Sequence, residues 1–156
     1  GIPPTRLTCE ITESVAMEDP AVVQRSFGQL ARLGVSLAID DFGTGHSSLS
    51  YLRKLPAKQL KIDRSFVNDL AQSDDARAVV EAVLKLAHAL GLKVVAEGVE
   101  NTRQQQILVE LGCDQLQGYL YARPMPAAEL LAWALGQRPA GAVEFSPSTV
   151  GELQGA

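Results

Sequence analysis

The residues best suited to chemistry are two adjacent carboxylates, Asp40 and Asp41, followed by the glycine-rich letters FGTG. Neighbouring carboxylates repel each other unless a cation lies between or beside them, and their oxygens are the ligands that Mg²⁺ or Mn²⁺ prefers. The glycines, Gly43 among them, let the backbone turn sharply close to a ligand. The pair therefore indicates a divalent metal site, although the same letters fit an ordinary turn with solvated carboxylates.

Polar residues also stand at or beside the ends of four other segments that favour strands. Glu10 lies in LTCEI, Lys61 in QLKI, Glu97 ends KVVAE and Gln117 ends DQLQ. In α/β folds the carboxyl ends of parallel strands meet at one edge of the sheet, where sites form. We therefore expect these four side chains to gather beside the aspartate pair.

Each of these residues also fits a plain structural role. Glu13 suits a helix cap or a loop brace, and Lys61 suits an ion pair with Asp63 at the rim of a sheet. Glu97 suits a solvated turn that leads to a helix cap at Asn101. Taken singly these residues leave both interpretations open, and only their combination favours a site.

The elements that must position these residues alternate along the chain. Apolar patterning predicts strands at 7–11, 35–40, 59–62, 93–97 and 114–117, and helices at 20–33, 75–90, 101–111 and 126–136. A glycine- and serine-rich loop at 41–48 and a short helix near 48–54 complete the pattern. Strands that alternate with helices of this length indicate βαβ units and a parallel sheet.

The two faces of the predicted strands differ in character. Leu37 and Ile39 share a bulky apolar face, whereas Ala38 and Asp40 share a small or polar one. Such asymmetry favours a barrel, which has helices outside and small side chains inside, over an open sheet with two apolar faces. A full (β/α)8 TIM-like barrel needs about 200–250 residues. We therefore predict its later part, about five βα units, in residues 1–136, with a loose tail at 137–156.

Composition excludes several classes of protein. Lys and Arg number 14 against 18 Asp and Glu in 156 residues, giving a net charge of −4, which argues against binding a nucleic acid polymer. The apolar runs are too short for a membrane segment. Cys9 and Cys113 are far apart and fit neither a disulfide framework nor a zinc site, so we expect a cytoplasmic location. A membrane anchor elsewhere in a longer protein remains open.

The segments EITES, AIDDFGTGHSSL, LKID, VVAEGVE and QGYLYARPMP, in this order, resemble the EAL-domain family over roughly residues 5–136. The resemblance covers about the last three-fifths of such a domain. It implies a TIM-like barrel that hydrolyses cyclic di-GMP, a bacterial second messenger, to linear pGpG with Mg²⁺ or Mn²⁺.

The resemblance also implies a role for each matching residue. It assigns metal binding to Glu10, Asp40, Asp41 and Glu97, with Asp41 serving the second metal. It assigns the holding of the attacking water to Lys61, support of the water and metal shell to Gln117, and a site role to Glu97. Bracing of the DDFGTG loop, which joins the family's dimer contact to its site, falls to Glu13. Substrate contact falls to Gly43, Arg123 and Pro124.

Two parts of the family pattern are absent from this sequence, namely the Glu-Ala-Leu motif and an Asn ligand on the following strand. Because every motif in the covered part is intact, we expect truncation rather than loss by point mutation, and a chain that is inactive alone. Five units cannot close an eight-stranded barrel, so we expect either that the open edges pair in a homo-oligomer or that the chain is only partly ordered. The resemblance is also compatible with a GGDEF or sensor domain attached in the full-length protein.

Two other functions compete with hydrolysis. One is a non-catalytic cyclic di-GMP receptor or protein-interaction module of the same family, which need not keep Asp40, Asp41 and Lys61. The other is a phosphoacceptor receiver domain, which also has βα units, an acidic pair and a lysine at strand ends. In a receiver the acidic pair follows the first strand and the lysine the last, whereas here they follow the second and third. The order of motifs therefore disfavours the receiver.

Overall fold

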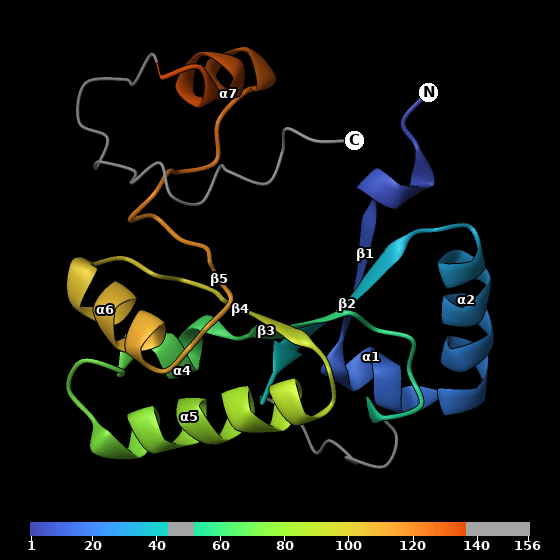
Figure 1. The fold of residues 1–156 in the computed structure, drawn as a ribbon, viewed down its shortest axis with the longest axis horizontal. Helices are drawn as coiled ribbons and strands as arrows, with labels where there is room; N and C mark the ends of the chain where they lie inside the picture. Colours follow the sequence, from blue (N-terminus) through green and yellow to red (C-terminus); the bar gives the residue numbers. More distant parts are fainter. Residues whose placement is uncertain (44–51, 137–156) are drawn as a thin grey trace.

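The computed structural model describes residues 1–43 and 52–136 and contains a parallel sheet (Figure 1). The sheet has five strands, in the order β1-β2-β3-β4-β5. Their bounds are Thr8–Thr12 (β1), Ser36–Phe42 (β2), Gln59–Ile62 (β3), Lys93–Ala96 (β4) and Gln115–Leu116 (β5). Each strand pairs only with its neighbours in the chain, so the predicted succession of βα units with a parallel sheet is confirmed.

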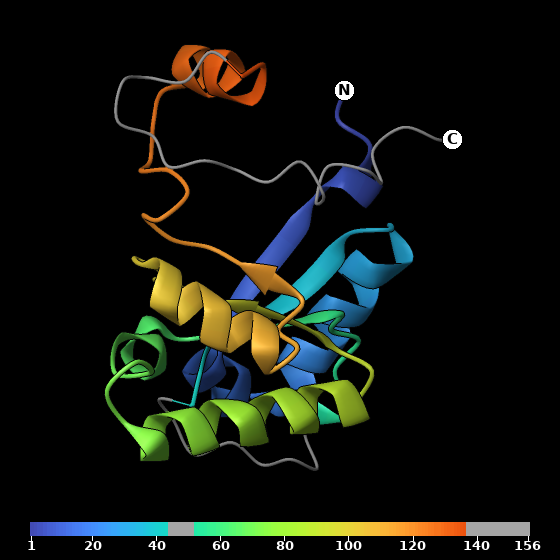
Figure 2. The same cartoon turned by 60° about the vertical axis from the view of Figure 1, so that its left-hand side comes forward.

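The helices between the strands cover one face of the sheet. The helix bounds are Glu13–Glu18 (α1), Pro20–Arg32 (α2), Arg64–Asn68 (α4), Asp74–Ala89 (α5), Thr102–Glu110 (α6) and Ala127–Ala134 (α7), after a 3₁₀ turn at Pro4–Arg6 (η1). In both views α5 runs along the underside of the sheet, whereas α7 stands above it (Figures 1 and 2). The predicted tail at 137–156 and most of the predicted helix near 48–54 lie outside the described residues.

Side-chain caps explain where the helices begin. Asp19 accepts a hydrogen bond from Val22 N at 3.1 Å, and Pro20 takes the first helical position of α2. Two helices that the sequence analysis did not predict also begin at caps, α1 after Thr12 and α4 after Asp63. Both span six residues or fewer, which is too short for apolar periodicity to reveal them.

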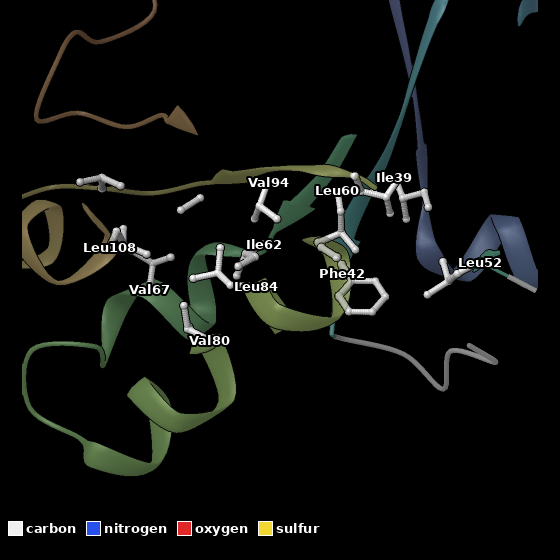
Figure 3. Close-up of a cluster of buried hydrophobic side chains, with 14 of the residues drawn as sticks. Ile39, Phe42, Leu52, Leu60, Ile62, Val67, Val80, Leu84, Val94 and Leu108 are labelled. Carbon is white, nitrogen blue, oxygen red and sulfur yellow. The ribbon is translucent and has the colours of Figure 1, made fainter. Parts of the chain in front are cut away.

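The core lies between the sheet and the helices. Alternate residues of the central strands point to this side and pack on α4, α5 and α6 (Figure 3). Its members include Ile39, Leu60, Ile62 and Val94 from strands, and Val67, Val80, Leu84 and Leu108 from helices. Burying each such side chain contributes about 1.5–3 kcal/mol. The opposite face carries Ala38, Asp40 and Lys61, small or polar as the alternation predicted for β2, but β4 adds the apolar Val95 to it.

The helix lengths and the two cysteines complete this description. Among the described residues, no helix is both long enough and apolar enough to cross a bilayer. Cys9 and Cys113 are free thiols. Burial raises the pKa of Cys113 to about 11, so this thiol stays protonated and unreactive at neutral pH.

Asp114 gives the fold a pH-dependent contact. Its carboxylate accepts a hydrogen bond from Val94 N at 2.8 Å and lies 2.8 Å from His88 Nε2 of α5. Burial opposes ionisation, but the contacts with His88 and Val94 outweigh it and lower the pKa of Asp114 below its ordinary value. Because the pKa of Asp114 is lower in the folded protein, its ionised carboxylate stabilises the fold above the ordinary pKa of about 3.9. This stabilisation is lost as pH falls through the pKa of Asp114 in the folded protein.

We expect Asp114→Asn to lower the free energy of unfolding at pH 7 by about 0.5–1.5 kcal/mol, since a charged acceptor becomes neutral. The difference should shrink as pH falls below about 3.9. Urea denaturation at pH 7 and pH 3 measures the difference, with Glu129→Gln at an exposed position as the control. An equal loss at pH 7 and pH 3 would show that the carboxylate charge has no part in the contact.

Candidate active site

Lys61 stands at the centre of the polar residues that the strands bring together. Its Nζ lies 2.8 Å from Glu10 Oε2 of β1, 3.1 Å from Asp40 Oδ1 of β2, and 2.7 Å from Glu97 Oε1 directly after β4. Carboxylates from three segments of the sheet therefore converge on the ammonium of a fourth, β3. Their predicted proximity is confirmed, whereas their roles in a reaction remain predictions.

The environment of Lys61 keeps its ammonium charged. The residue is 7% exposed, and burial alone would favour the neutral amine. Hydrogen bonds to the three carboxylates outweigh burial and raise the pKa of Lys61 above its ordinary value. The ammonium therefore remains protonated at neutral pH and offsets part of the negative charge around it.

Three carboxylates in this cluster could hold a metal ion. One oxygen each from Asp40, Asp41 and Glu97 lie within 4.8 Å of one another, and all three residues are half-buried. An all-oxygen set of this kind fits Mg²⁺ or Mn²⁺ and does not favour a soft metal. Glu10, the fourth predicted ligand, is not in this group and joins it through Lys61. Its side chain is 46% exposed, which leaves it open to a further ligand.

An irregularity in β2 explains how two consecutive aspartates reach one site. Strict alternation would point Asp40 and Asp41 to opposite faces. The pairing of β2 with β3 shifts register between Ile39 and Phe42, and Asp41 has a φ of 53°, in the left-handed region. Asp40 Oδ1 accepts a hydrogen bond from Asp41 N at 3.0 Å. The predicted strand end at residue 40 was wrong, because the strand continues through this bulge to Phe42. Residues 44–48 of the predicted loop lie outside the described residues.

Glu13 links α1 to the backbone just after the aspartates. It is 1% exposed, and its Oε2 accepts a hydrogen bond from Gly43 N at 2.7 Å. Gly43 has a φ of 101°, and a Cβ there would lie 2.7 Å from Phe66 Cε2. The position thus requires glycine, and the contact is the kind that a loop brace would make.

The segment that carries Glu97 is held by its neighbours on both sides. Glu97 N donates to Ile62 O of β3 at 3.1 Å, and Val99 N donates to Gln117 O at 3.0 Å. A Cβ on Gly118 would overlap the backbone of Val99, so the two segments can approach only because residue 118 is glycine. Glu97 therefore has a fixed position between β3 and the chain after β5.

The remaining predicted residues lie after β5 and are exposed. The backbone N of Gln117 donates to Ala96 O at 2.9 Å. Within the described residues, Gln117 is thus linked to the segment of Glu97 through its backbone. Arg123 lies with its guanidinium carbon 4.4 Å from the centre of the Tyr119 ring. Pro124 is exposed in the segment that leads to α7. Their roles in substrate contact stay predictions.

One buried polar residue outside the carboxylate cluster was not predicted from the sequence. Gln104 of α6 is 4% exposed and hydrogen-bonds to segments on both sides of it. Its signal was present in the spacing of Asn101 and Gln104, which is typical of a capping box. The cap was predicted, but spacing alone does not indicate the bond that Gln104 makes to a different helix.

Comparisons with known proteins agree with this geometry. The sequence profile of the EAL domain matches residues 1–124. The bifunctional diguanylate cyclase/cyclic di-GMP phosphodiesterase MucR of Pseudomonas aeruginosa is 53% identical over 132 residues, which are 85% of this chain and 19% of MucR. The chain therefore spans less than a fifth of that relative.

Solved structures resemble the fold closely. The MucR phosphodiesterase in complex with c-di-GMP has a TM-score of 0.80 and 52% identity, over 83% of this chain and 52% of that one. Klebsiella pneumoniae BlrP1, in a complex with manganese and cy-diGMP, has a TM-score of 0.74 and 35% identity, over 80% of this chain and 32% of that one. Both matches are well above the level at which only the fold would be shared.

Proposed function

Because the chain belongs to the EAL domain family, we propose that it forms part of a phosphodiesterase that hydrolyses cyclic di-GMP to linear pGpG with Mg²⁺ or Mn²⁺. The observation that carries the proposal is the convergence of Glu10, Asp40 and Glu97 on Lys61. The c-di-GMP in the MucR complex and the manganese in the BlrP1 complex support the substrate and the metal class.

Asp40, Asp41 and Glu97 would hold the metal, with Glu10 beside them. A divalent cation bound there supplies a water nucleophile at neutral pH and shields the charge that develops on the phosphate. Lys61 would orient that water and stabilise the developing negative charge with its buried ammonium.

The segment after β5 would receive the substrate. Gln117 would extend the polar shell beside Glu97 through the hydrogen bond between their two segments. The guanidinium of Arg123 suits a phosphate oxygen, and its exposed position leaves it accessible. Gly43 would let the backbone pass close to the ligand, and Pro124 would direct the chain away from it.

The functional unit is proposed to be larger than this chain. Residues 1–136 would form the partial domain, and the two-activity name of MucR supports a longer protein that also carries a cyclase (GGDEF) or sensor domain. The sheet edges at β1 and β5 would be covered by further strands or by another copy, which makes a homo-oligomer or dimer the expected assembly. The net charge of −4 suits a small-molecule substrate better than a nucleic acid polymer.

Hydrolysis of cyclic di-GMP, followed by chromatography of the products, tests the proposal. We expect the full-length protein to form pGpG only when Mg²⁺ or Mn²⁺ is present, and the 156-residue chain to be far slower. Binding of cyclic di-GMP by the full-length protein with no pGpG formed would instead support the receptor alternative.

Glu13→Ala is expected to weaken Mn²⁺ binding and self-association together, because the hydrogen bond that fixes Gly43 N is lost. Loss of a buried, charged acceptor should also lower the free energy of unfolding by about 2 kcal/mol. Calorimetric titration with Mn²⁺ and light scattering measure the two effects, with the exposed Glu18→Ala of the same helix as the control. An unchanged titration with lower activity would place Glu13 nearer the chemistry than a brace.

A further inference from the structure

Gln104 is a buried polar residue with no role in the chemistry proposed above. Its Oε1 accepts hydrogen bonds from Glu100 N at 2.8 Å and Asn101 N at 3.2 Å. Its Nε2 donates to Val67 O of α4 at 3.1 Å. One amide therefore joins three parts of the chain, namely α6, the segment before it, and α4.

The segment before α6 begins at Glu97, whose carboxylate contacts Lys61 at 2.7 Å. At its start the segment is fixed by the bonds of Glu97 N and Val99 N to the ends of neighbouring strands. Gly98, with a φ of 70°, lies so close to α4 that a Cβ there would be 2.5 Å from Arg64 Cβ. The path from Glu97 to α6 thus depends on how the segment packs against α4, and Gln104 makes a hydrogen bond between α6 and α4.

We propose that Gln104 is a positioning residue that holds the Glu97 carboxylate beside Lys61 and the two aspartates. The inference rests on the proposed function, because only that function gives Glu97 a role in metal binding. The contacts of Gln104 themselves do not depend on it. Only an amide serves here, because it accepts from two backbone N–H groups and also donates to a carbonyl. A leucine would leave Glu100 N and Asn101 N without their side-chain acceptor, and a glutamate would turn a second acceptor toward Val67 O.

The test compares Gln104→Leu and Gln104→Glu with Ser73→Ala in the full chain. Ser73 Oγ caps α5 by accepting from Ala76 N at 3.1 Å, so its loss removes a helix cap away from the site and costs about 1 kcal/mol of stability. Two readouts are taken under conditions where circular dichroism shows each variant folded. One is the Mn²⁺ dissociation constant, and the other is the Nζ resonance of Lys61, which senses the Glu97 contact without metal.

We expect Gln104→Leu to weaken Mn²⁺ binding about tenfold or more and to shift the Lys61 resonance. Gln104→Glu keeps the acceptor for Glu100 N and Asn101 N, so its effects on Mn²⁺ binding and on the Lys61 resonance should be smaller. Ser73→Ala should change neither readout. If the Gln104 variants lose stability as Ser73→Ala does but leave both readouts unchanged, the residue is only structural and the proposal is overturned.

The two proposals fail in different ways. If the wild-type chain binds no Mn²⁺ but the Lys61 resonance still moves in Gln104→Glu, the positioning role holds and the metal site is wrong. If Mn²⁺ binds equally well to all folded variants and the resonance stays fixed, the metal site holds and the positioning role is wrong. Should Gln104→Leu not fold, Gln104→Glu alone decides by the same two measurements.

Discussion

Asp40→Asn is expected to reduce Mn²⁺-dependent hydrolysis by the full-length protein to below about a tenth of the wild-type rate. The side chain keeps its size, but the neutral amide replaces a carboxylate that serves two partners. Asp40 Oδ1 contacts Lys61 Nζ at 3.1 Å and accepts from Asp41 N at 3.0 Å, while the residue also belongs to the group of three candidate ligands. Product chromatography and Mn²⁺ titration measure the two losses.

Asp74→Asn is the matched control for this change. Asp74 is an exposed carboxylate in the first turn of α5, and the same substitution there should leave hydrolysis and Mn²⁺ binding unchanged. Activity of Asp40→Asn above about a tenth of wild type would remove Asp40 from the ligand set, since a lost metal ligand costs far more than that.

Lys61→Met is expected to abolish hydrolysis and to lower the free energy of unfolding by about 2 kcal/mol at pH 7 without metal. Removing one partner of a fully buried ion pair costs about 3–5 kcal/mol. The loss here is smaller because water partly screens the carboxylates, whose side chains are 20–46% exposed. Mn²⁺ should stabilise the variant more than the wild type, since the cation replaces the missing positive charge.

Urea denaturation at pH 7 with and without Mn²⁺ measures the loss of stability and its recovery by the metal. Lys85→Met, which breaks only an exposed pair with Glu81, is the control. A variant as stable as the wild type in metal-free buffer would mean that Lys61 does not hold the carboxylates together.

The main elements could be predicted because each rests on a local rule. β3 occupies the predicted residues Gln59–Ile62, and α6 begins after the predicted cap at Asn101. Strand alternation also separated the core residues Leu37 and Ile39 from Asp40. These features depend on side chains within a few residues of one another, so a single sequence is enough to reveal them.

The features that escaped prediction depend on contacts between distant segments. The bulge that turns Asp41 toward Asp40 reflects the pairing of β2 with β3. The bond from Gln104 to Val67 spans 37 residues, and that from Gly43 to Glu13 spans 30. Neither apolar periodicity nor helix-cap patterns indicate contacts between residues so far apart in the sequence. The roles of Gln117 and Arg123, and assembly through the sheet edges, stay predictions for the same reason.

The sequential order of the strands determines when the charges of the site meet as the protein is made. Each strand pairs with the one synthesised before it, so the sheet can grow while the chain leaves the ribosome. Glu10 and Asp40 emerge first, and their mutual repulsion is relieved when β3 delivers Lys61. The Glu97 segment then docks on three strands that already hold a positive charge. The growing chain thus never has to bring its three lysine-bound carboxylates together before their shared cation has been synthesised.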